Sequence, residues 1–81
     1  MNGEFIVDVD TSRTACGAIL TQLREDESGA MYRVPIAFAS RRLNEAEQAY
    51  SATELEGLGC AFACRRFRPW LHGRVFTLRC D

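Results

Sequence analysis

The sequence contains no lysine, so all ten of its basic residues are arginine. A guanidinium can hold a phosphate or a carboxylate through two parallel hydrogen bonds, which slightly favours a surface that binds such groups. Biased codon usage is a simpler explanation for the absence of lysine. The net charge is −1 and the sequence pI is 5.8, far below the pI of about 9 or more that is typical of dedicated nucleic-acid binders. Composition alone therefore does not establish a polyanion as the partner.

Long apolar runs and a secretory leader are also missing. No stretch reaches the roughly 18 apolar residues that a membrane-spanning helix needs, and the first four residues lack the basic start and apolar stretch of a signal peptide. These absences predict a soluble, intracellular protein in a reducing environment. With 81 residues the chain can form one small domain, which buries only roughly 60 to 65 % of its unfolded surface.

The four cysteines, Cys16, Cys60, Cys64 and Cys80, form no CxxC pair. Cys60 and Cys64 would lie one helical turn apart, and His72 follows them, but this spacing matches no usual zinc site. We therefore expect the cysteines to be small core residues, and neither a zinc site nor a disulfide is predicted.

What the sequence does contain begins with Phe5 to Ser12, an apolar, β-branched run that ends in carboxylates and hydroxyls. It predicts a central strand, with Asp8 and Asp10 on one face. Ala15 to Leu23 is a second apolar run, a charged loop occupies residues 24–29, and Met31 to Ser40 supplies a third strand. These three strands are expected to form an antiparallel meander. Pro35 cannot donate to a ladder, so the third strand should lie at an edge or be bulged.

Two capping patterns predict helices after the strands. Asn44 with Glu47 indicates a short helical turn, and Ser51 with Glu54 begins a longer helix. Helical apolar spacing continues from about Thr53 to Leu71, where Pro69 and Gly73 mark the stop. Residues 75–80 then read as a fourth strand.

Three carboxylates stand out from this pattern. On a helical wheel Glu54 falls on the polar face, whereas Glu56 falls among apolar residues, although a solvated place in the first turn would also suit it. Asp81 ends the last strand as Asp10 ends the first. If these strands are neighbours and the helix crosses them, Asp10, Glu56 and Asp81 converge. Three carboxylates so close to one another repel unless cations lie between them, and Mg²⁺ prefers oxygen ligands.

The ordered motifs resemble the ribonuclease H domain of gypsy-type LTR retrotransposon polyproteins, and the resemblance covers nearly the whole chain. They are Phe5-Ile6-Val7-Asp8-Val9-Asp10-Thr11-Ser12, Gly17-Ala18-Ile19-Leu20-Thr21-Gln22, Pro35-Ile36-Ala37-Phe38-Ala39-Ser40-Arg41-Arg42-Leu43, Tyr50-Ser51-Ala52-Thr53-Glu54-Leu55-Glu56, Phe67-Arg68-Pro69-Trp70-Leu71-His72-Gly73 and Phe76-Thr77-Leu78-Arg79-Cys80-Asp81.

The resemblance implies an α/β fold: a mixed sheet with three antiparallel strands, a crossover helix and a fourth strand parallel to the first. It implies that Asp10, Glu56 and Asp81 bind two Mg²⁺ ions, with Mn²⁺ as a substitute, and hydrolyse the RNA strand of RNA·DNA hybrids. Arg41 and Arg42 would contact the nucleic acid. The implied partner is the polymerase domain of the same reverse transcriptase polyprotein, in a cytoplasmic retroelement particle or in the nucleus, with no membrane.

Several positions depart from the family pattern. Thr11 stands where Ala is usual, Cys80 where Thr is usual, and Gly57 and Gly59 where the family has better helix formers. The family also continues to a fourth acidic ligand beyond Asp81, so residues 1–81 are expected to be the first part of the domain, its C-terminal part missing and its activity alone in question.

Two alternatives stay open. The chain could be a non-catalytic module that packs on a reverse transcriptase or binds hybrid through arginines, among them Arg66 and Arg68. Asp8-Val9-Asp10-Thr11 could also be the nucleophile motif of a haloacid-dehalogenase-like phosphatase, but that family needs a downstream lysine, which the chain lacks.

Overall fold

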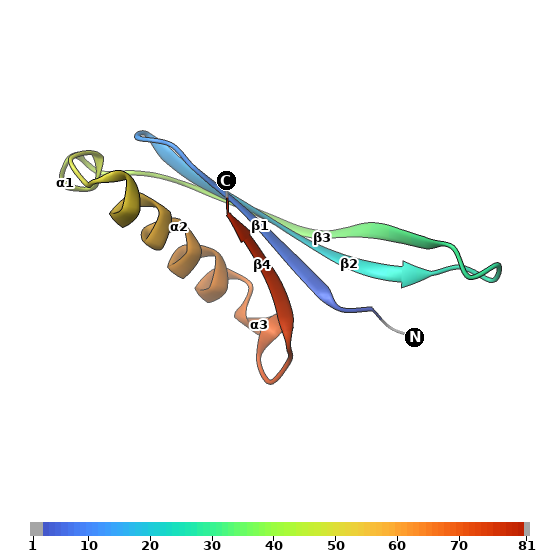
Figure 1. Ribbon diagram of the computed structural model, residues 1–81. Coiled ribbons are helices and arrows are strands. Elements are labelled where there is room, and N and C mark those ends of the chain that lie inside the picture. Colours follow the sequence, from blue (N-terminus) through green and yellow to red (C-terminus); the bar gives the residue numbers. More distant parts are fainter. Residues whose placement is uncertain (1–2, 81) are drawn as a thin grey trace.

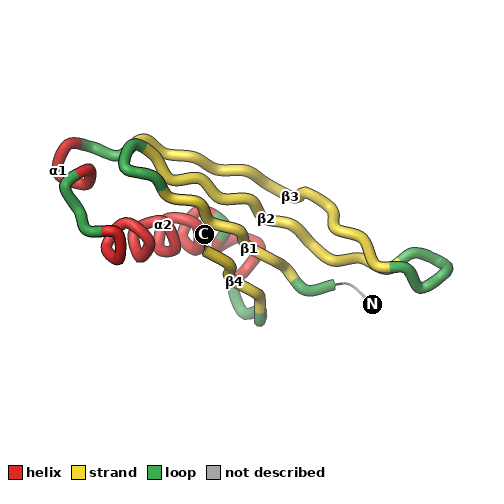
Figure 2. The backbone as a smooth tube through the Cα atoms, turned by 45° about the horizontal axis from the view of Figure 1, so that its top comes forward, coloured by secondary structure: helices red, strands yellow, loops and turns green. Residues whose placement is uncertain are grey.

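The computed structural model describes residues 3–80, which form one mixed sheet with helices against one of its faces (Figures 1 and 2). The order along the chain is β1 (Phe5–Thr11), β2 (Ala15–Glu25), β3 (Met31–Arg42), α1 (Glu45–Gln48), α2 (Ala52–Arg66), α3 (Arg68–Leu71) and β4 (Phe76–Cys80). In the described part of the chain, no helix is both long and apolar enough to cross a membrane.

The sheet order is β3-β2-β1-β4, with β1 antiparallel to β2 and parallel to β4. The antiparallel meander is confirmed, and so is the parallel fourth strand that the resemblance implied. In Figure 1, α2 and α3 form the crossover between β3 and β4. Phe5 of β1 lies opposite Phe76 of β4, and Val9 lies opposite Cys80. Since partners in a parallel ladder point to the same face, the apolar residues of β4 face the helices.

Pro35 lies on an edge strand and beside a bulge, as predicted. Leu20 pairs with Ala37 but the next residue, Thr21, pairs with Pro35, so Ile36 is an extra residue in β3. β3 is also longer than predicted, ending at Arg42 rather than Ser40. The two extra residues pair with the start of β2, opposite Cys16 and Ala15.

The long helix predicted from Thr53 to Leu71 is two helices. α2 ends at Arg66, and Phe67 separates it from α3. Pro69 explains the break because it has no N–H to donate to the carbonyl of Arg65, so the hydrogen bonds of α2 cannot continue through it. Pro69 lies instead in the first turn of α3, where a missing N–H is tolerated. Both predicted capping boxes are present: Asn44 caps α1 with Glu47, and Ser51 caps α2 with Glu54.

The core lies between the sheet and α2. Phe67 is only 1 % exposed, and burial of a side chain of this size stabilises the fold by about 2 to 3 kcal/mol. The buried residues of this cluster are Phe5, Val7, Val9, Ala18, Leu20, Ala39, Ala63, Phe67 and Leu71. A second, smaller cluster of Cys16, Leu43 and Leu55 closes the end near α1.

α2 lies directly against β1 at Gly59. A Cβ added there would lie 2.1 Å from the Thr11 Oγ1 atom and 3.0 Å from the Val9 Cγ1 atom. Any side chain at position 59 would therefore push the helix off the strand. This contact sets the distance between α2 and the carboxyl end of β1, where Asp10 lies.

Candidate active site

Asp8 and Asp10 share one face of β1 but have different surroundings. Arg33 Nη2 donates to one carboxylate oxygen of Asp8 and Arg79 Nε to the other, each at 2.7 Å. Arg79 chiefly, with help from Arg33, lowers the pKa of Asp8 below its ordinary value, and together they outweigh the opposing effect of burial. Asp8 is thus an ionised carboxylate held between two guanidinium groups, and its role is structural.

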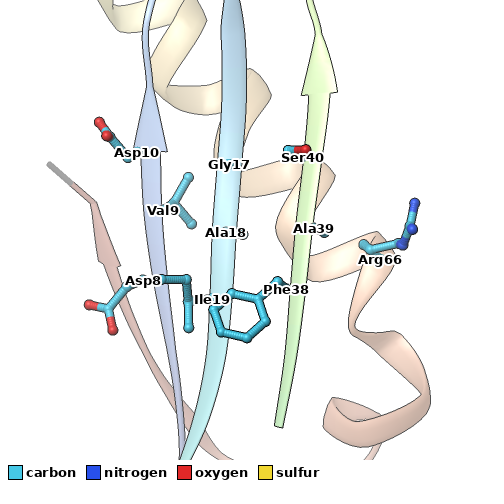
Figure 3. Close-up of a pocket in the computed structure, with 10 residues that line it drawn as sticks. All are labelled: Asp8, Val9, Asp10, Gly17, Ala18, Ile19, Phe38, Ala39, Ser40 and Arg66. Atoms are coloured by element: carbon cyan, nitrogen blue, oxygen red, sulfur yellow. The ribbon is translucent and has the colours of Figure 1, made fainter. Parts of the chain in front are cut away.

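Asp10 is exposed, and its carboxylate forms no hydrogen bond or ion pair with another residue among residues 3–80. It lines a surface hollow over the sheet together with Gly17 and Ser40, and Arg66 lines the opposite side (Figure 3). Figure 3 shows the carboxylates of Asp8 and Asp10 projecting from β1 on the side away from β2. Asp10 is therefore a carboxylate at the end of a central strand with its oxygens uncommitted.

Glu56 lies in the first turns of α2, close to the end of β1. It lines a second hollow with Thr11, Ser12 and Arg13. The wheel placed Glu56 on the apolar face, but it is exposed, because the buried face of α2 runs through Leu55, Gly59 and Ala63. The two glutamates are therefore not separated by helix face, but their contacts differ: Glu54 forms the capping box with Ser51, and Glu56 forms no such bond within residues 3–80.

Arg13 fixes the approach of α2 to this end of the sheet. Its Nη1 atom donates to the carbonyl oxygen of Gln48 at 3.1 Å and to that of Tyr50 at 3.0 Å. The segment just before the Ser51 cap is thereby tied to the β1–β2 turn. Sequence reasoning missed this role, and no local pattern signals it because the partners are more than thirty residues away.

The third predicted ligand, Asp81, lies outside the described residues. Among residues 3–80, no group of three or more His, Cys, Asp or Glu side chains is arranged to hold a metal ion. Asp10 and Glu56 line two different hollows. The first hollow includes Asp10 of β1, and the second, which Glu56 lines, includes the next residue of β1, Thr11. The described part of β4 ends opposite Val9.

The two predicted nucleic-acid contacts differ in availability. Arg41 binds Glu47 through two hydrogen bonds, of 3.0 and 2.6 Å, and this pair lowers the pKa of the Glu47 carboxyl. Glu47, only 7 % exposed, needs that partner. Arg42 is exposed on the neighbouring position of β3.

The cysteines are not all core residues. Cys16 is buried, and its burial raises the pKa of its thiol. Cys60 and Cys64 are half-buried and Cys80 is exposed. The thiol of Cys60, on α2, contacts the thiol of Cys80, on β4. Their spacing of twenty residues hides this pairing from a sequence pattern.

A mixed sheet in the order β3-β2-β1-β4, with β1 parallel to β4 and a helix crossing between β3 and β4, defines an α/β domain of the ribonuclease H-like class. Comparison with known proteins gives the family. The model of the RNase H-like domain found in reverse transcriptase matches residues 1–81. The chain belongs to this family.

The relatives are transposon polyproteins. The chain is 38 % identical over 78 residues to the retrovirus-related Pol polyprotein from transposon 412 of Drosophila melanogaster, with 96 % of the chain covered. It matches the polyprotein from transposon 297 of the same organism at the same identity and coverage, and that from transposon opus at 36 % over 77 residues. The chain spans 6 to 7 % of the length of these relatives. The family supersedes the phosphatase alternative, whose nucleophile, Asp8, is bound by two arginines.

Proposed function

We propose that this chain is a metal-dependent endonuclease domain that hydrolyses the RNA strand of RNA·DNA hybrids during retrotransposon reverse transcription. Asp10, Glu56 and Asp81 are the proposed ligands of two Mg²⁺ ions. One observation carries the proposal: Asp10 and Glu56 remain uncommitted within residues 3–80, whereas their neighbours Asp8 and Glu54 are engaged in structural contacts.

The residues fit the proposed metal. Mg²⁺ takes oxygen ligands, keeps several waters and completes its shell with substrate phosphates, and both described carboxylates are exposed enough for a phosphodiester to approach. When bound, a metal pair would activate the attacking water and stabilise the leaving oxygen. Mn²⁺ would serve as a substitute.

The protein contributes position and charge. Arg13 and Gly59 hold α2 against the end of β1, so Glu56 is presented beside the strand that carries Asp10. Arg42 and Arg66, both exposed, would contact phosphates of the hybrid, while Arg41 would contact them only by sharing its guanidinium with Glu47. The proposed setting is a cytoplasmic retroelement particle or the nucleus, beside the polymerase domain of the same polyprotein.

The test is cleavage of an RNA·DNA hybrid labelled on its RNA strand, with Mg²⁺ added or withheld. Asp10→Asn and Glu56→Gln should each lower the rate by about 100-fold or more, the scale on which loss of one charge-stabilising group acts. The matched controls are Asp8→Asn and Glu54→Gln, which change neighbouring acids that have structural roles. Cleavage by Asp10→Asn at the wild-type rate would disprove the assignment.

A second candidate is a non-catalytic module that docks on a reverse transcriptase or holds the hybrid. It is favoured by exposed apolar side chains on the sheet, among them Phe38 at 69 % exposure and Ile19 at 41 %. In this case Asp10→Asn would leave hybrid binding intact and no variant would cleave. Binding through the arginines should weaken steeply as salt rises, and salt-independent binding would contradict it.

A further inference from the structure

Two thiols from distant parts of the chain meet on the helix-covered side of the sheet. The Sγ atom of Cys60, on α2, lies 2.6 Å from the Sγ atom of Cys80, on β4. Cys60 is half-buried and Cys80 is exposed, so small molecules in solution can reach the pair. Nothing in the proposed cleavage chemistry uses either thiol.

The packing of the fold accounts for this meeting. Gly59 lies directly against Val9 of β1, and Cys80 is the residue of β4 that pairs with Val9. Position 60 is therefore the next helix residue after the close contact, and its side chain reaches the adjacent strand. Cys80 has the same strand parity as Phe76, which packs on the core, so its side chain points toward the helix.

We propose that Cys60 and Cys80 form a reversible intramolecular disulfide when the protein meets a small-molecule disulfide such as oxidised glutathione. One cysteine thiolate attacks a glutathione sulfur, breaking the glutathione S–S bond and releasing one reduced glutathione. The second thiolate then attacks the mixed disulfide and releases the other. Two protein thiols are oxidised, their two protons pass to the released glutathione thiolates, and one glutathione disulfide is thereby reduced to two thiols.

The crosslink would join α2, which carries Glu56, to the strand that precedes Asp81. It would therefore tie together two elements of the proposed site, yet its formation depends on neither carboxylate. The disulfide and the cleavage activity can thus fail independently of each other.

The experiment exposes the folded, reduced chain to oxidised glutathione and counts thiols with a chromogenic reagent, alongside the intact mass. The wild type should lose two of its four thiols and the mass of two hydrogen atoms, without a crosslink between chains. A phosphine reductant should restore both thiols. Cys64→Ser, which removes the other half-buried cysteine of α2, should lose two thiols as well. Cys60→Ser and Cys80→Ser each lack one of the two thiols, so neither should form the internal crosslink. The remaining thiol should stay free or retain one bound glutathione, which the intact mass identifies.

Mapping the crosslink keeps the test valid if a variant fails to fold. Cys60 and Cys64 have no arginine between them and remain on one tryptic peptide, so the map is made on Cys64→Ser as well as on the wild type. A crosslink between Cys60 and Cys80 in folded protein, replaced by mixed pairings in urea, supports the proposal. The proposal would be overturned if the folded protein kept all four thiols after treatment with oxidised glutathione. It would also be overturned by a crosslink that joins other cysteines or two chains.

Discussion

Gly59 and Thr11 allow a quantitative test of the packing that positions the site. In Gly59→Ala the new Cβ would stand 2.1 Å from Thr11 Oγ1 and 3.0 Å from Val9 Cγ1. Alanine is favoured over glycine in a helix interior by up to about 1 kcal/mol, but overpacking costs about 1 to 3 kcal/mol. The net effect on the free energy of unfolding should be a loss of about 1 kcal/mol.

The same distances predict that Thr11→Ala relieves most of this cost. The removed Oγ1 atom is the closest obstacle, and the remaining contact at 3.0 Å is with one methyl group of Val9. We therefore expect Gly59→Ala to be neutral or stabilising in a Thr11→Ala background, with a coupling energy of about 1 to 2 kcal/mol.

The measurement is urea denaturation of the wild type, the two single variants and the double variant. Gly57→Ala is the matched control, because an added Cβ there meets nothing within 4 Å and should stabilise the chain by about 1 kcal/mol. Two results would refute the reasoning: Gly59→Ala as stabilising as Gly57→Ala, or single-variant effects that add within about 0.3 kcal/mol.

Further predictions concern the polar contacts around the site. Since Arg79 and Arg33 lower the pKa of Asp8 in the folded state, the ionised form favours folding, so this contribution is full above the ordinary Asp pKa of about 3.9 and fades as pH falls through the lower folded value. Asp8→Asn should accordingly be less stable than wild type at neutral pH, with the gap closing in acid, and a gap independent of pH would contradict this. Arg41→Ala should lower the urea midpoint by leaving the buried Glu47 without its partner, and an unchanged midpoint would count against a structural role. Ser51→Ala should cost about 1 kcal/mol of stability by removing the α2 cap, whereas Ser51→Asn should retain it.

Local patterns predicted the elements of this fold because their causes are local. Alternation located β1 and its two aspartates, and the capping boxes at Asn44 and Ser51 located both helix starts. Pro35 predicted an irregular edge strand because a missing N–H is a property of one residue. The helix break at Phe67 was missed because apolar spacing continues across it.

The candidate site was only partly predictable for the same reason. The motif order singled out Asp10 and Glu56, but a helical wheel assumes one buried face and misplaced Glu56 by one position relative to Leu55. The environment of Asp8 depends on Arg33 and Arg79, from two other strands. Such pairings arise from the order and register of the strands, which cannot be read from a short stretch of sequence.

In this domain the contacts of each acid distinguish the acids that stabilise the fold from those that we propose as metal ligands. Where a carboxylate stabilises the fold, the structure supplies its donors: two guanidinium groups for Asp8 and a cap for Glu54. Asp10 and Glu56 lie close to these residues in sequence and receive no donor from residues 3–80. An exposed carboxylate without donors contributes little to folding, so these two acids are available for the metal binding proposed above. The neighbouring variants Asp8→Asn and Asp10→Asn separate the two roles, since the first should change stability and the second cleavage.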